Sequence, residues 1–132
     1  PIETTGELKS AVARFLPKGS ENKVLAQIFQ ALRIEVNEEM KVLEAFLSQC
    51  ADVLNPGGRL VVLSYHSLED RLVKNFMKTG NADGNLKKDF FGNQLTPYKL
   101  MTSKPIIPTD EEIQMNSRAR SAKLRVAERR AK

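Results

Sequence analysis

Apolar side chains recur at helical intervals through the first part of the chain. Thr4 and Glu7 have the spacing of a capping box, and apolar residues follow at steps of three and four. Pro17 and Gly19 end this pattern, which predicts a short first helix.

A longer apolar stripe runs from Leu25 to Leu54 at the same steps, after a helix start near Glu21. Because about 30 residues is long for one helix of a globular protein, we expect a break near Asn37, a residue type that caps helices. The turn-forming residues 55–58, Asn-Pro-Gly-Gly, end the helical region.

The pattern changes in residues 59–64, where the four apolar residues from Leu60 to Leu63 show no alternation. Such a run favours a strand buried on both faces, as in a parallel sheet covered by helices. Ser67 then has the position of a helix cap, and Asp70 follows three residues later. Helix, tight turn, buried strand and returning helix predict a doubly wound α/β fold.

The remaining residues mix loop and strand signals. Residues 79–94 are rich in Gly, Asn, Asp and Lys, which predicts a mobile surface loop, and residues 98–107 are typical of a strand near a sheet edge. Thr109 starts a capping box for a short helix that ends near Asn116. Residues 122–128 alternate in part and predict a last strand, followed by a basic tail.

Composition indicates one modest globular domain, since 41% of the 132 residues are hydrophobic and 28% are charged. The single cysteine, Cys50, cannot form an internal disulfide and is expected in the core of a protein from a reducing compartment. No apolar stretch approaches the roughly 20 residues of a membrane span, and the first residues are unlike a secretion signal. We expect a cytoplasmic protein without a membrane partner, trimmed or partial because it starts at proline.

The net charge of +5 is concentrated at the C-terminal end. Residues 117–132 hold seven basic residues and one acid, which leaves 14 bases and 15 acids in the other 116 residues. A basic segment on a neutral body fits a polyanion, because each neutralised phosphate releases counterions. A solvated, solubilising tail explains the same charge, and charge alone does not separate the two.

Candidate chemistry is concentrated in residues 64–71, which hold the only histidine together with hydroxyls and two acids. Ligands of open α/β sheets bind outside the carboxyl ends of the strands, so Ser64 and His66 are candidate catalytic residues. A structural alternative has Ser67 capping the helix and His66 filling a polar niche. One histidine and one distant cysteine do not form a metal site, so we expect no metal.

A second polar group, Gln30, Arg33 and Asn37, lies at steps of three and four beside the apolar stripe. These side chains carry several donors and suit phosphates or base edges, although structural hydrogen bonding is the alternative. Gly57 and Gly58 precede a strand, so they do not form a phosphate-binding loop.

Three blocks, in order, resemble those of the MraW family: FQALRIEVNEEM at 29–40, NPGGRLVVLSYHSLEDR at 55–71 and NSRARSAKLRVAER at 116–129. The resemblance covers essentially the whole chain. It implies an S-adenosylmethionine-dependent methyltransferase that modifies the N4 amine of a cytidine in 16S ribosomal RNA. A small RNA-binding module without catalysis is the alternative, and a nucleotide-dependent enzyme of other chemistry is disfavoured because no phosphate loop is present.

The resemblance also implies that an N-terminal half, which binds S-adenosylmethionine, is absent. Residues 1–35 would finish a helical insertion domain, and residues 36–132 would form the C-terminal half of a class I, Rossmann-like methyltransferase domain. We therefore expect no cofactor-binding residue here and no activity from this chain alone.

The same resemblance assigns roles to the candidate residues. Ser64 and His66 would line the cleft, and the residues expected to contact 16S ribosomal RNA in the small ribosomal subunit are Gln30, Arg33, Asn37, Arg118, Arg120 and Lys123. Because the absent half would supply a neighbour for residues 59–64, that strand would present a bare apolar edge. Such an edge invites pairing, so we expect the chain to form a homodimer.

Overall fold

The computed structural model describes residues 1–131, which fall into two compact units, Pro1–Glu39 and the described residues from Met40 onward. The first unit begins with helix α1 (Thr5–Val12) and a short 3₁₀ turn (Ala13–Phe15). The predicted capping box is confirmed: the Glu7 N–H donates to Thr4 Oγ1 (3.2 Å), and the Thr4 N–H donates to Glu7 Oε2 (3.0 Å). Helix α2 (Glu21–Val36) completes the unit.

The predicted break of the long helical region is confirmed, but the role of Asn37 differs. Asn37 ends α2, its N–H donating to the Arg33 carbonyl (3.0 Å), rather than capping the next helix. The following residue, Glu38, has φ 50°, a left-handed conformation that stops the helix. Helix α3 (Glu39–Val53) begins at the next residue.

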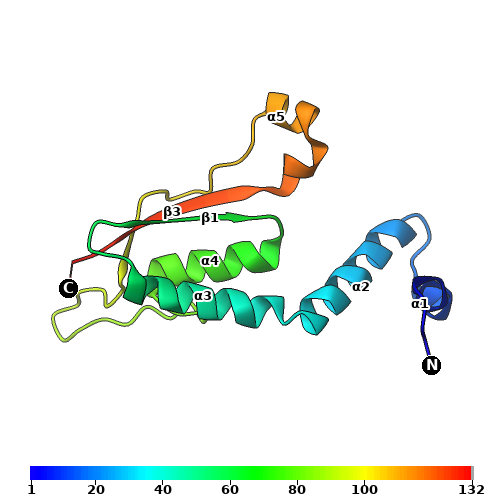
Figure 1. Ribbon diagram of the computed structural model, residues 1–132, viewed down its shortest axis with the longest axis horizontal. Helices are drawn as coiled ribbons and strands as arrows, with labels where there is room; N and C mark the ends of the chain where they lie inside the picture. The colour runs from blue at the N-terminus through cyan, green and yellow to red at the C-terminus, as the bar shows by residue number, and fades with distance from the viewer. Residues whose placement is uncertain (132) are drawn as a thin grey trace. The chain divides into compact units, whose positions relative to one another are not determined.

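The second unit combines α3 with a three-stranded sheet and further helices, as Figure 1 shows. The remaining elements are β1 (Arg59–Ser64), α4 (Ser67–Thr79), β2 (Tyr98–Leu100), α5 (Asp110–Met115), a 3₁₀ helix η2 (Ser117–Ser121) and β3 (Lys123–Arg129). The α-helices and strands lie where the sequence predicts them, although β2 is shorter, while η2 was not predicted. Thr109 caps α5 by accepting from the Glu112 N–H (3.2 Å).

β3 is the central strand of the sheet, in the order β1-β3-β2, and both pairings are antiparallel. Helices α3 and α4 lie on the same side of the sheet (Figure 1). Side chains from both helices and all three strands form the core: Leu47, Cys50, Leu60, Val73, Phe76, Met77, Tyr98 and Ala127. Cys50 is buried as predicted, and burial raises the pKa of its thiol.

The prediction of an α/β fold is confirmed, but two details of β1 are wrong for the described residues. Its only pairing there is antiparallel, and only one of its faces is covered. Val61 and Leu63, on the other face, are 56% and 50% exposed. The apolar residues 60–63 do not reveal this exposure, because a strand sequence does not show which other segment covers each of its faces.

Residues 81–94, within the predicted surface loop 79–94, form hydrogen-bonded turns with a bridge between Lys88 and Gln94. Their mobility stays a prediction. Among the described residues, every helix is too short or too polar to span a bilayer.

Candidate functional site

The turn from β1 into α4 holds the candidate catalytic residues. Ser64 is buried, and its Oγ donates a weak hydrogen bond to the Lys123 carbonyl (3.4 Å). Helix α4 is capped by His66 instead of the predicted Ser67: His66 Nδ1 accepts from the Glu69 N–H (3.3 Å). The Glu69 carboxylate in turn accepts from the Tyr65 N–H (3.1 Å), so the turn is closed by its own side chains.

The cap selects one tautomer of the neutral His66 ring. Because Nδ1 accepts a hydrogen bond, the proton of the neutral ring is on Nε2. Nε2 is buried and lies 3.3 Å from Glu69 Oε1 without hydrogen-bond geometry. His66 therefore has a structural role at the helix start, and its catalytic role stays a prediction.

A buried ion pair joins this turn to β3. Arg125 donates to Asp70 through Nε (2.7 Å) and Nη2 (3.1 Å), and Lys123 Nζ lies 3.6 Å from the same carboxylate. The hydrogen bonds from Arg125 are the largest cause that lowers the pKa of Asp70. The pair connects the second sequence block, which contains Asp70, with the third, which contains Arg125. From the sequence alone, Asp70 is expected at a helix start and Arg125 in a solvated basic segment.

The basic C-terminal segment is only partly a surface feature. Arg129 belongs to β3 and donates to the carbonyls of Ala51 (2.9 Å) and Pro97 (3.1 Å), and Arg130 donates to the Tyr98 carbonyl (2.9 Å). The predicted basic tail therefore begins one residue later than expected, because Arg129 belongs to β3, whereas Arg130 lies beyond the strand and is exposed. Arg125 is paired to Asp70, whereas Arg118 and Arg120, both on η2, face solvent.

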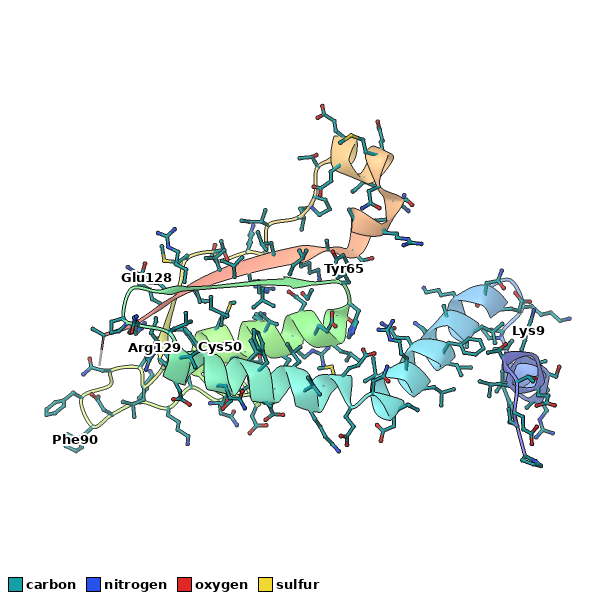
Figure 2. The ribbon with its side chains drawn as sticks, in the orientation of Figure 1. Lys9, Cys50, Tyr65, Phe90, Glu128 and Arg129 are labelled. Carbon is teal, nitrogen blue, oxygen red and sulfur yellow. The ribbon has the colours of Figure 1, made fainter. Side chains whose placement is uncertain are left out.

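A cleft of about 550 Å³ opens between the uncovered face of β1 and η2. Its walls are mostly apolar and carry a few polar groups, among them Leu63, Tyr65, Ile106, Ile107, Asn116 and Arg118. Figure 2 shows Tyr65 where β1 ends. An aromatic ring, an amide and a guanidinium around an apolar hollow suit a planar, polar-edged ligand such as a nucleobase. Of the predicted site residues, Arg118 lines this cleft.

The polar stripe of the first unit makes a separate arrangement. Arg33 donates to both Glu39 carboxylate oxygens (2.7 and 3.1 Å), and Asn37 Nδ2 lies 3.4 Å from Oε1 of the same residue. Gln30 is half-buried on α2. These bonds favour the structural interpretation of Arg33 and Asn37, while RNA contact by the three residues stays a prediction.

Comparison with known proteins places the chain in a family. The model of the MraW methylase family matches residues 1–130, so the chain belongs to that family and the resemblance of the three blocks is confirmed. It is 58% identical over 128 residues to a Parabacteroides distasonis protein, covering 97% of this chain and 42% of that protein. A Flavobacterium johnsoniae protein is 57% identical over 129 residues, with 98% and 42% covered.

A third relative, from Amoebophilus asiaticus, is 58% identical over 131 residues, with 99% of this chain and 42% of that protein covered. All three relatives are named ribosomal RNA small subunit methyltransferase H. The chain therefore spans less than half the length of the curated relatives that it matches.

Proposed function

We propose that the complete protein transfers a methyl group from S-adenosylmethionine to the N4 amine of a cytidine in 16S ribosomal RNA. Family membership over residues 1–130, with relatives named as ribosomal RNA methyltransferases, is the observation that carries this proposal. The described chain contributes the C-terminal half of the catalytic domain, residues 36–132, and the end of a helical insertion, residues 1–35. A unit boundary after Glu39, close to this division, supports the assignment.

The methyl donor is assigned to the absent half, because the residues of this chain do not fit it. Within residues 1–131, β1 and α4 are the one pair in which a strand turns directly into a helix. That turn, 64–67, contains no glycine, its Tyr65 N–H donates to the Glu69 carboxylate, and in the first turn of α4 the Glu69 N–H donates to His66 Nδ1. It therefore lacks the glycine-rich loop whose backbone N–H groups could cradle a carboxylate or ribose. We therefore derive no transfer step through residues of this chain.

The open side of the sheet supports the proposal of a larger, doubly wound domain. β1 pairs only with β3 among the described strands, so its second edge can accept a further strand. The exposed face at Val61, which lies outside the cleft, can likewise accept a helical layer. Both surfaces would lie inside the complete domain.

The described cleft would contribute to the RNA side of the reaction. A cytosine amine is a weak nucleophile because its lone pair is delocalised into the ring, so the enzyme must hold an unstacked base in line with the donor. Tyr65 can stack on a base, and Arg118 can bind a phosphate or a base edge. Arg120, exposed on the same 3₁₀ helix, would hold a neighbouring phosphate.

Methyl transfer to unmodified 16S ribosomal RNA by the complete protein tests the proposed function. Methylation of the cytidine N4 amine by purified complete protein and donor supports it. RNA binding without any methyl transfer would instead favour the non-catalytic RNA-binding module, an interpretation that the exposed arginines of η2 also suit.

Changing both Arg118 and Arg120 to Ala in the complete protein tests the RNA side. We expect weaker RNA binding, with a salt dependence flattened by about 0.7 per lost phosphate contact on single-stranded RNA. Arg71→Ala with Lys74→Ala, the same change of charge on α4, is the matched control. If both double variants weaken RNA binding equally, the arginines of η2 contribute only through the net charge of the protein.

The His66→Asn variant separates the two roles of His66, because Asn retains a side-chain oxygen that caps α4. If His66 positions the substrate, methylation falls while the melting temperature is retained. Unchanged methylation would leave His66 with the capping role alone.

A further inference from the structure

Residues 87–95 form a tight hairpin with a defined backbone. The Leu95 N–H donates to the Lys87 carbonyl (2.8 Å), and the Asp89 N–H donates to the Asn93 carbonyl (2.9 Å). At the tip, Gly92 has φ 86°, which only glycine adopts without strain, and its N–H donates to the Asp89 carbonyl (3.1 Å). These bonds give the tip one backbone path.

The Asp89 side chain fixes the tip further. Its Oδ1 accepts from the N–H groups of Phe91 (2.9 Å) and Asn93 (2.8 Å), and its Oδ2 accepts from Asn93 Nδ2 (2.8 Å). The carboxylate is therefore turned back onto the hairpin. Asp89 is the only acid of residues 87–95, and its carboxylate does not point outward where it would repel an anion bound at the tip.

Two phenylalanine rings are presented by this hairpin. Phe90 is 97% exposed and Phe91 is 85% exposed, although burial of such a large apolar ring would be favourable. Their centroids are 5.6 Å apart with the planes at 87°, so one ring meets the edge of the other and outer faces stay open. Figure 2 shows Phe90 at the outer end of this loop, directed away from the sheet.

Exposed lysines, Lys87 and Lys88, precede the rings at the base of the hairpin. Open aromatic faces beside lysines match single-stranded RNA, whose unpaired bases stack on rings and whose phosphates bind cations. A membrane-surface anchor is disfavoured, because it needs a broad apolar face. Here the polar side chains of Asn93 and Gln94 are exposed next to the two rings.

We propose that the hairpin tip, residues 87–94, is an RNA-binding site in which Phe90 and Phe91 stack on unpaired bases. Lys87 and Lys88 bind the flanking phosphates. The site is separate in sequence from η2 and its cleft, so it gives the RNA a second contact. The choice of ribosomal RNA as the natural ligand rests on the proposed function, whereas the stacking itself does not.

A single tryptophan reports on stacking directly, because the chain contains no Trp. In the full chain carrying Phe90→Trp, we expect a short single-stranded oligoribonucleotide to quench the fluorescence. The same sequence in a duplex, and inorganic polyphosphate, should leave it unchanged. Phe15→Trp is the matched control, since Phe15 is also exposed and lies 4.6 Å from the Arg14 guanidinium.

Affinity and salt dependence then separate the rings from the lysines. The double variant Phe90→Ala, Phe91→Ala should weaken oligoribonucleotide binding about fivefold or more with an unchanged salt slope. The double variant Lys87→Ala, Lys88→Ala should flatten that slope by about 0.7 per lost contact. Because all four side chains are exposed, circular dichroism should show unchanged folding for both variants.

Several outcomes would overturn the proposal. Equal quenching in the Phe15→Trp control would make the signal nonspecific, and quenching by phosphatidylglycerol vesicles but not by RNA would make the tip a membrane contact. A blue-shifted, protected emission from the Phe90→Trp variant of the complete protein, without RNA, would show that another part of the protein covers the tip. If the complete protein methylates RNA and the tip variants bind RNA as tightly as the parent, the hairpin tip is not an RNA-binding site. The proposed methyltransferase function would then still hold.

Discussion

The two faces of the sheet are built differently. On one face, α3 and α4 cover the strands, and side chains such as Leu47 and Met77 are completely buried. On the other face, Val61 and Leu63 of β1 are about half exposed, and Ile106 beside β3 is exposed as well. The covered face excludes water from its apolar side chains, while the open face has apolar side chains without a covering layer in the described residues.

This difference indicates which interactions this chain supplies by itself. The covered face contains the stabilising contacts, including the Asp70–Arg125 pair at its edge. The open face contains the cleft beside Arg118 and the free edge of β1, which suit partners. Substitutions on the covered face should therefore change stability, and substitutions on the open face should change association.

The largest expected loss of stability comes from the buried ion pair. Asp70→Ala leaves the Arg125 guanidinium without its partner, and such a change costs about 3–5 kcal/mol of unfolding free energy. Urea denaturation measures it. A loss below about 1 kcal/mol would show that water solvates Arg125 in the native protein.

The same pair gives a pH dependence with a defined sign. Arg125 lowers the pKa of Asp70 in the folded state, so the stabilisation is present above the unfolded-state value of about 3.9. It is lost as the pH falls through the lower, folded-state pKa. Asp70→Asn should therefore flatten the acid limb of the stability profile, measured by urea denaturation at a series of pH values.

A matched pair of truncations compares the two faces next. Leu47→Ala removes a completely buried side chain and should cost about 2–5 kcal/mol. Val61→Ala, on the open face, should stay within about 0.5 kcal/mol because the site is half exposed. Similar losses for both, in denaturant titrations at concentrations below the dimer dissociation constant, would mean that the open face is covered even in the monomer.

Self-association of the chain is expected to have an intermediate effect. The apolar edge and face of β1 favour a homodimer, and Val61→Lys with Leu63→Lys should raise the dimer dissociation constant at least about tenfold, or about 1.4 kcal/mol. Light scattering over a range of concentrations gives the measurement. A monomer at high concentration, before any substitution, would contradict the prediction.

The smallest effect concerns an imperfection of the covered face. The Tyr98 hydroxyl is buried without a hydrogen-bond partner among the described residues, and this burial raises its pKa to about 12. Tyr98→Phe keeps the ring and removes the unsatisfied group, so it should stabilise the fold by about 1 kcal/mol. Thermal denaturation of the two proteins makes the comparison. A destabilised variant would indicate a water or side chain that satisfies the hydroxyl.

Local signals in the sequence predict most element boundaries. The Thr4 and Thr109 caps and the turn at 55–58 depend on residues only a few positions apart, so they can be identified from the sequence alone. β1 and β3 pair antiparallel, with Arg59 opposite Glu128. A pairing between residues so far apart in the sequence cannot be predicted from a local pattern.

The candidate site was predicted less completely than the fold. His66 and Ser67 both lie at the start of α4, and residue preferences favour Ser as the cap, whereas the structure uses His66. The basic composition of residues 117–132 suggests that Arg125 is solvated. Composition does not show that alternate residues of a strand face the core, where Arg125 lies. The cleft beside Arg118 is lined by residues of β1 and η2 that are far apart in the sequence, so only the tertiary structure reveals it.

The central claim is that this chain supplies the RNA side of a methyltransferase, while the absent half binds the donor. Isothermal titration with S-adenosylmethionine, on the 132-residue chain and on the complete protein, tests it most directly. We predict binding by the complete protein and no measurable heat of binding by the chain alone. Micromolar affinity of the chain by itself would contradict it, because a donor pocket would then lie within these residues.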